Sequence, residues 1–351
     1  MISFTVKHPD EGAMRVSRVR WDAVAKPLRS LGHLEDAITR IAGIQRTADI
    51  ALSPRCALIF CADHGIVAQG VSQTDRSVTA LVARAIARGT SNVNLMAEVS
   101  ATPVYAVDVG MATDVDEPGI IRKKTMYGTK DMSVCPAMTR AQAEEAILSG
   151  MDTVSEMKQK GVRLIALGEM GIGNTSATAA VCCVLMGLSV KEAVDRGAGL
   201  SDEGLLRKRR AVERALKIHQ PDPADPIDVL SKVGGLELCA MARACLGGMT
   251  YDVPIIIDGV IAEAAALAAC RLCPEVRQFL LASHIGHELP ARLIIEELGL
   301  TPLICADLAL GEGTGAVAVL PLLDMAKRVY ESAHTFTALG MNAYTEKGGT
   351  V

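Results

Sequence analysis

Glu312 is the residue whose surroundings in this sequence most favour chemistry. It lies in the loop 310–315 (LGEGTG), directly before an apolar segment with helical character. The flanking glycines give a ligand access to the carboxylate, and a glutamate whose pKa is raised toward neutrality can act as a general base. A structural role is equally compatible with the pattern, because a negative charge at a helix start stabilises the helix by about 0.3–1 kcal/mol.

A second glycine-rich loop, residues 168–176 (GEMGIGNTS), has the same design and contains Glu169. It follows an apolar run and precedes an alanine-rich segment, which predicts a turn from a strand into a helix. Unpaired N–H groups at a helix N-terminus favour anions, so this loop is suited to phosphate. Thr175 and Ser176 can either donate to a phosphate oxygen or cap the helix. The spacing differs from the dinucleotide fingerprint GxGxxG, which disfavours a dehydrogenase.

Other polar residues are weaker candidates, because each has a simpler structural explanation. Asp63 and His64 follow an apolar run, where such a pair is more often a hydrogen-bonded turn than a metal or acid–base site. Lys208 lies in a charged helical run, which is usually a solvated face, with a phosphate contact as the alternative. Asp258 and Glu288 are further acidic candidates for which a structural role is favoured.

Six short apolar runs, separated by helical segments, would position these residues. They are residues 56–61, 103–107, 162–167, 253–257, 279–282 and 302–305. Fully buried parallel strands have continuous apolar sequences, and helical crossovers join them. The sequence therefore predicts an α/β fold with a Rossmann-like, six-stranded parallel sheet and flanking helices. Glycines and acidic residues gather where the runs end, which is where ligands bind in such sheets.

The two ends of the chain differ from this pattern. Residues 14–46 indicate two helices separated by a break, and residues 317–332 indicate a helix with Pro321 near its start. We expect residues 1–45 and 322–351 to form a small helical subdomain. Residues 46–321 would then form the large α/β domain.

Composition excludes several classes of protein. The 351 residues are 50% apolar and only 3% aromatic, with a formal net charge of −4, so a nucleic-acid surface is not expected. The most apolar stretch, residues 254–270, contains Asp258 and Glu263, which disfavours a membrane span. No apolar signal segment occurs near Met1, and the ten cysteines suggest reduced thiols, so we predict a cytoplasmic location. No cluster of metal-ligand residues is apparent, and no metal is expected.

The motifs together resemble those of the nicotinate-nucleotide–dimethylbenzimidazole phosphoribosyltransferase family, which prepares the lower ligand of cobamides. The resemblance covers nearly the whole chain. It is carried, in order, by residues 26–35 (KPLRSLGHLE), 63–72 (DHGIVAQGVS), 108–110 (DVG), 128–129 (GT), 137–139 (AMT), 168–175 (GEMGIGNT), 234–237 (GGLE), 258–259 (DG), 283–284 (SH) and 310–315 (LGEGTG).

The resemblance implies that nicotinate mononucleotide donates its 5-phosphoribosyl group to an aromatic base, with inversion to the α-riboside and release of nicotinate. It implies Glu312 as the general base and Glu169 as a second active-site carboxylate. The implied phosphate and nucleotide site comprises Gly171, Gly173, Asn174, Thr175, Ser176, Lys208, Gly313 and Thr314. Ser72, Asp63 and Met170 would line the base pocket. The leaving group needs no general acid, because nicotinate leaves with a neutral ring nitrogen, and no cofactor is expected.

Some residues depart from the family pattern. Ala309 stands where the family commonly has arginine, Gly286 and Pro290 where it has serine and glycine, and Arg29 where it has glycine. These departures leave the acceptor open: dimethylbenzimidazole, adenine or a phenol. The resemblance implies a homodimer. The alternative is a subunit that pairs with a paralogue, acts on phenolic acceptors and is weakly active alone.

Overall fold

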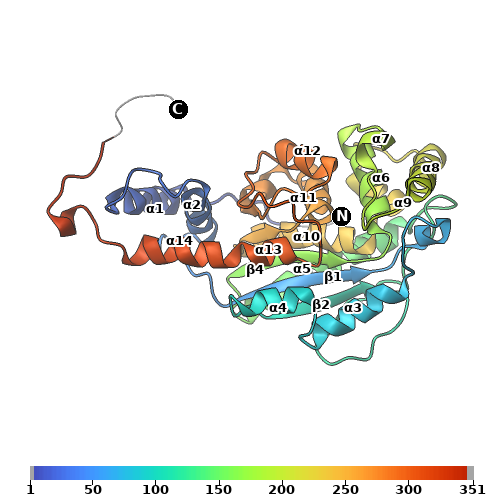
Figure 1. The fold of residues 1–351 in the computed structure, drawn as a ribbon, viewed down its shortest axis with the longest axis horizontal. Helices are drawn as coiled ribbons and strands as arrows, with labels where there is room; N and C mark the ends of the chain where they lie inside the picture. The colour runs from blue at the N-terminus through green and yellow to red at the C-terminus, as the bar shows by residue number, and fades with distance from the viewer. Residues whose placement is uncertain (1–3, 346–351) are drawn as a thin grey trace.

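A six-stranded, all-parallel sheet forms the centre of the protein, whose computed structural model describes residues 4–345 (Figure 1). The strand order is β3-β2-β1-β4-β5-β6. The strands are β1 Arg55–Ala62, β2 Val104–Gly110, β3 Ile121–Arg122, β4 Leu164–Met170, β5 Ile255–Ile257 and β6 Leu280–Ala282. Every residue of β1 is buried, as expected for a central strand covered on both faces. The predicted six-stranded parallel α/β fold is confirmed.

One predicted strand was wrong, and one strand was missed. Residues 302–305 do not form a strand, because only Ile304 pairs, through an isolated parallel bridge to His284. The sixth strand is instead β3, which pairs with Val107 and Asp108 at the edge of the sheet. A two-residue edge strand buries little surface and therefore leaves no apolar run in the sequence.

Helices cover both faces of the sheet, and alternate residues of β1 point to opposite sides. Cys56, Leu58 and Phe60 pack with α5, α6 and α9–α11, whereas Ala57 and Ile59 pack with α1–α4, α13 and α14. The helices are α1 Glu11–Ala23, α2 His33–Gln45, α3 Ser77–Ala87, α4 Asn92–Glu98, α5 Arg140–Gln159, α6 Asn174–Met186, α7 Val190–Ala193, α8 Asp202–His219, α9 Pro226–Val233, α10 Leu236–Tyr251, α11 Val260–Leu272, α12 Leu289–Leu298, α13 Thr314–Ala318 and α14 Leu320–Ser332. Short 3₁₀ helices are η1 Gly65–Gln69, η2 Pro274–Phe279 and η3 Thr337–Leu339. Within residues 4–345, no helix has the length and apolar character that crossing a bilayer requires.

Helices from the N-terminal and C-terminal parts of the chain pack against each other. Helix α14 lies beside α2 (Figure 1), and the rings of Trp21 and Tyr330 pack with centroids 5.0 Å apart. Arg55 of β1 donates two hydrogen bonds of 2.7 Å to Asp324 of α14, which ties this helix to the sheet. The division into two domains stays a prediction, and its residues 1–3 and 346–351 lie outside the described part of the chain.

Candidate active site

Acidic side chains gather at the carboxyl edge of the central strands. Asp63 follows β1, Glu169 lies near the end of β4, and Asp258 follows β5. Because these parallel strands are neighbours, their ends meet at one edge, and Phe60 of β1 is directly opposite Glu169. The loop of Glu312 reaches the same edge, because Gly313 packs so closely on Gly168 that a Cβ at residue 168 would collide with it.

Glu312 is held in an uncommon backbone conformation. Its φ is +59°, and Gly311 and Gly313 on either side both have φ of +80°. A left-handed conformation costs a residue other than glycine about 1–2 kcal/mol, so surrounding contacts must maintain it. Buried Asp258 supplies two of them, because its carboxylate accepts from the backbone N–H groups of Gly313 and Ala316, each at 3.0 Å. Asp258 is thus an anchor for the loop.

The surroundings of the Glu312 carboxyl group favour a role as a base. It is half-buried, and its Oε2 atom is buried without a hydrogen-bond partner. Burial and the negative charge of Asp258 raise its pKa above the ordinary glutamate value. A raised pKa brings a carboxylate closer to the proton affinity that general-base catalysis near neutral pH requires.

Glu169 is more deeply buried than Glu312 and belongs to the same cluster. The side-chain amide of Asn174 donates to its Oε2, and its Oε1 lies 3.0 Å from the position that a Cβ at residue 311 would take. Burial, followed by the charges of Glu237 and Asp258, raises the pKa of Glu169 to about 8. The charge of Glu312 adds to this rise, so the two glutamates are close enough to interact. The Glu169 carboxyl group therefore holds its proton more strongly than an ordinary glutamate does.

A basic region adjoins this acidic cluster at the start of α6. Lys208 of α8 is only 1% exposed, so the expectation that it belongs to a solvated face was wrong. Its ammonium group donates to Thr175 Oγ1 at 2.8 Å and to the carbonyl oxygen of Asp195 at 3.0 Å. Burial lowers the pKa of Lys208 to about 8. A phosphate at this point would meet the lysine and the positive end of the α6 dipole, although the amides of Asn174 and Ser176 already donate to the carbonyl oxygens of Gly171 and Gly173.

The remaining predicted binding residues lie around these two regions. Gly171 packs on the carbonyl of Ala62, Gly173 caps α6 with φ of +98°, and Ser176 has a buried hydroxyl without a partner. Thr314 donates its hydroxyl to the carbonyl oxygen of Gly311 at 2.7 Å, and the Gly313 amide is taken by Asp258. The Thr314 hydroxyl and the Gly313 amide therefore already donate hydrogen bonds within the protein.

The predicted base-pocket residues are less closely connected. Asp63 is buried, and its Oδ2 accepts from the Ala112 amide at 2.7 Å, while its Oδ1 has no partner. Met170 ends β4 opposite Cys61. Ser72 lies in the loop before α3, and its hydroxyl accepts from the Thr74 amide at 3.3 Å. Among residues 4–345, no hydrogen bond joins Ser72 to either glutamate of the cluster.

Sequence reasoning missed one pair of side chains at this edge. His64 Nε2 lies 2.7 Å from Glu237 Oε1 of α10, and both side chains are almost fully buried. A glutamate after two glycines at a helix start was the available signal, but its partner lies 173 residues away. In the described part of the chain, no group of three or more His, Cys, Asp or Glu side chains is arranged to hold a metal ion.

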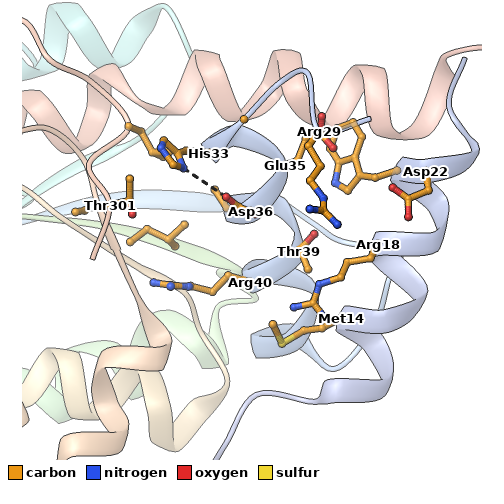
Figure 2. A pocket seen from close by; sticks show the side chains of 16 residues that line it. Met14, Arg18, Asp22, Arg29, His33, Glu35, Asp36, Thr39, Arg40 and Thr301 are labelled. Carbon is orange, nitrogen blue, oxygen red and sulfur yellow. Dashed lines mark hydrogen bonds and ion pairs between the residues drawn. The ribbon is translucent and has the colours of Figure 1, made fainter. Parts of the chain in front are cut away.

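A cleft of about 610 Å³ lies elsewhere, between α1, α2 and β6 (Figure 2). Both basic and acidic side chains line it, including Arg18, Asp22 and Arg40. Figure 2 shows these three side chains spread along the helices. Arg29, which departs from the family's glycine, also lies here and adopts the left-handed φ of +57° that glycine favours. Because the carboxyl groups with raised pKa values lie at the strand ends, we place the candidate site there.

Comparisons with known proteins relate this chain to phosphoribosyltransferases. A family model described as phosphoribosyltransferase matches residues 6–340. Nicotinate-nucleotide–dimethylbenzimidazole phosphoribosyltransferase of Ruminiclostridium cellulolyticum is 39% identical over 332 residues, which cover 95% of this chain and 94% of that relative. The protein of the same name from Chloroflexus aggregans is 39% identical over 350 residues, or 99% of each chain. A crystal structure of such an enzyme from Thermus thermophilus matches with a TM-score of 0.88 and 39% identity, covering 95% of this chain and 99% of that one.

Proposed function

This chain belongs to the nicotinate-nucleotide–dimethylbenzimidazole phosphoribosyltransferase family, and we propose how its residues carry out that reaction. The 5-phosphoribosyl group of nicotinate mononucleotide passes to an aromatic lower-ligand base, and nicotinate is released. The product is an α-riboside 5′-phosphate used in cobamide biosynthesis. One observation carries the assignment of roles: an unpartnered carboxylate oxygen of Glu312 lies at the same sheet edge as buried Lys208.

The two charged regions match the two charged parts of the nucleotide. The phosphate group would bind at the α6 N-terminus beside Lys208 and Thr175, which are 2.8 Å apart. The pyridinium ring is a cation, and positive charge develops at the anomeric carbon as the ring departs. Glu312 and Asp258 provide negative charge on that side of the site. Once nicotinate leaves with a neutral ring nitrogen, this attraction is weakened, which favours release.

Glu312 is the proposed general base for the transfer. One nitrogen of the azole attacks the anomeric carbon and forms the new bond. The bond from that carbon to the pyridinium nitrogen breaks, and its electron pair stays on nicotinate. The proton on the other azole nitrogen passes to the Glu312 carboxylate. Attack from the face opposite the leaving ring inverts the configuration from β to α.

The finer assignments are predictions that rest on the sequence. They include the preferred acceptor, the homodimer and the cytoplasmic location. The alternative of a subunit that pairs with a paralogue and uses phenols is a second candidate, motivated by Ala309, Gly286 and Pro290. All three lie in the segment that precedes the Glu312 loop.

The direct test is incubation of the purified chain with nicotinate mononucleotide and a panel of acceptors. The panel contains dimethylbenzimidazole, benzimidazole, adenine, phenol and p-cresol, and nicotinate release is followed by chromatography. We expect release with at least one azole by the chain alone. Release that requires a paralogous chain would favour the second candidate, and no release under either condition would refute both.

A further inference from the structure

Transfer between two bound substrates requires that the protein holds them at a fixed distance from each other. The reacting atoms must approach to about 3–3.5 Å, and a misplacement of about 1 Å can lower the rate by about 10²-fold. In the proposed site, the acceptor lies on the side of Ser72 and the nucleotide phosphate on the side of Lys208. The acceptor segment, residues 70–79 (GVSQTDRSVT), contains Ser72 and the first turn of α3. Contacts that hold this segment against the phosphate region therefore bear on the rate of transfer.

Thr79 joins the acceptor segment to the glycine-rich loop before α6. Its side chain is fully buried, and its hydroxyl oxygen accepts a hydrogen bond of 3.1 Å from the backbone N–H of Ile172. Ile172 lies between Gly171 and Gly173, in the middle of the predicted phosphate-binding turn. Because a backbone amide inside the protein needs an acceptor, the Thr79 hydroxyl helps to fix where this turn lies.

The same hydroxyl adjoins Asp63, which is a predicted residue of the base pocket. Burial raises the pKa of Asp63, and the Ala112 amide and the Thr79 hydroxyl counteract this rise. Helix α3 also packs against both β1 and β4. Thr79 therefore lies where α3, the end of β1 and the loop before α6 meet.

Gln73, in the middle of the acceptor segment, makes a second contact with the phosphate region. Its side-chain amide donates to the carbonyl oxygens of Ala198, at 2.9 Å, and of Gly199. These carbonyl groups belong to the segment that begins at Asp195, whose own carbonyl oxygen accepts from the Lys208 ammonium group at 3.0 Å. Gln73 thus ties the acceptor segment to the chain that adjoins Lys208.

Helix α8 holds the other end of the acceptor segment. Arg207 Nε donates to the carbonyl oxygen of Gly70 at 3.3 Å, and the next residue of α8 is Lys208. Within the segment, the Thr74 amide donates to the Ser72 hydroxyl at 3.3 Å. The acceptor segment is therefore held against the phosphate region at both ends and in the middle, with Ser72 between these contacts.

We propose that Thr79 is a positioning residue that sets the distance between the acceptor and the phosphate group of the nucleotide. Because it is fully buried, Thr79 acts through the Ile172 amide on one side and the acceptor segment on the other. Gln73 supports the same spacing from the surface. The inference rests on the proposed function, because that function assigns the acceptor and the phosphate to these two regions.

The test measures the spacing with the reaction product, the α-riboside 5′-phosphate of dimethylbenzimidazole. This molecule contains both the base and the phosphate, so its affinity depends on how well the two regions are spaced. Without nicotinate the reverse reaction cannot occur, and calorimetry gives the Kd of the product without turnover. Dimethylbenzimidazole alone is the second probe, because it reports on the acceptor side only.

Thr79→Val removes the hydroxyl group and keeps nearly the same shape. We expect the Kd of the product to rise by about 10-fold, the usual contribution of one hydrogen bond, while the Kd of dimethylbenzimidazole stays within about twofold. The kcat for transfer should fall by about 10–100-fold. Thr79→Ser keeps the hydroxyl and should restore both quantities. Thr153→Val is the control, because Thr153 is also fully buried and donates to the Ser149 carbonyl oxygen at 2.8 Å, within α5.

Gln73→Ala is a second variant that should leave folding intact, because Gln73 is exposed. We expect the Kd of the product to rise by about threefold, again with little change for dimethylbenzimidazole, because a hydrogen bond at the surface contributes less than a buried one. Gln159→Ala is the matched control, since Gln159 is an exposed residue of α5 that donates to Ser155 at 3.3 Å. It should leave both Kd values unchanged.

An unchanged product Kd in Thr79→Val would overturn the proposal. So would an equal rise for dimethylbenzimidazole alone, which would mean that Thr79 only supports the acceptor pocket, or an equal rise in Thr153→Val. If Thr79→Val does not fold, the product Kd of Gln73→Ala decides in the same way. A wild-type protein that binds the product no better than dimethylbenzimidazole would refute the proposed function and this inference together. A wild type that binds the product tightly and transfers, with Thr79→Val equal to it, would refute the inference alone.

Discussion

The loops that precede α6 and α13 have nearly the same residue pattern, yet their helix N-termini have different partners. Both are capped by a glycine with positive φ, Gly173 and Gly313. At α13, which has only five residues, the Asp258 carboxylate accepts hydrogen bonds from the N-terminal amides and so acts as an internal anion. At α6, which has 13 residues, buried Lys208 lies beside the first turn instead. The first arrangement holds the Glu312 loop in place, and the second is suited to an external anion.

Burial moves the ionisable groups of the two regions toward neutrality in opposite directions. The pKa of Glu312 in the α13 loop is raised above the ordinary glutamate value, whereas that of Lys208 beside α6 falls to about 8. In both regions, charge is disfavoured until a ligand of opposite charge replaces the lost water. The difference between the loops therefore indicates which end of a nucleotide each one receives.

Glu312→Gln should have the largest effect, because it removes the base from the α13 loop while keeping its shape. We expect kcat to fall by about 10²–10⁴-fold, the usual contribution of a general base. The KM for the nucleotide should change little, because its phosphate binds at the other loop. Nicotinate release under saturating substrates measures the effect, with Glu213→Gln on the exposed face of α8 as the control. A wild-type kcat would remove Glu312 from this role.

Lys208→Ala should have the next largest effect, and on binding rather than on turnover. The KM for nicotinate mononucleotide should rise by about 10–100-fold, which corresponds to losing a charged hydrogen bond of about 1.5–3 kcal/mol. In the wild type the KM should rise as the pH increases through about 8, since Lys208 then loses its proton. This rise should be absent from the variant. Lys217→Ala, an exposed lysine of the same helix, is the matched control. An unchanged KM in Lys208→Ala would contradict the phosphate contact.

Asp258→Asn should have the smallest effect, and it tests whether the internal anion positions Glu312. The amide side chain keeps one acceptor but leaves a backbone N–H of α13 unpaired. We expect kcat to fall by about 10-fold, from a cost of about 1–3 kcal/mol, with little change in the nucleotide KM. Asp225→Asn provides the comparison, because Asp225 likewise accepts from two amides, at the start of α9. Equal losses of kcat in both variants would show a general effect on stability instead.

Much of the fold was predictable from local patterns. The strands β1, β2, β4, β5 and β6 each overlap an apolar run, because a strand buried on both faces needs apolar residues throughout. The same pattern over residues 302–305 was misleading, since an apolar run also occurs where a chain only touches a sheet edge. The glycine loops and Glu312 were found because glycine and strand ends mark ligand sites in α/β sheets.

The sequence by itself therefore determined the parallel sheet, the family and the two loops at the strand ends. Only the tertiary structure decided that Lys208 is buried, that Asp258 anchors the Glu312 loop and that Glu237 pairs with His64. The reason is physical. Burial patterns recur along a strand or helix and can be recognised locally, whereas the charge state of a side chain depends on partners brought close by folding. Asp258 and Gly313 are 55 residues apart, and His64 and Glu237 are 173 residues apart.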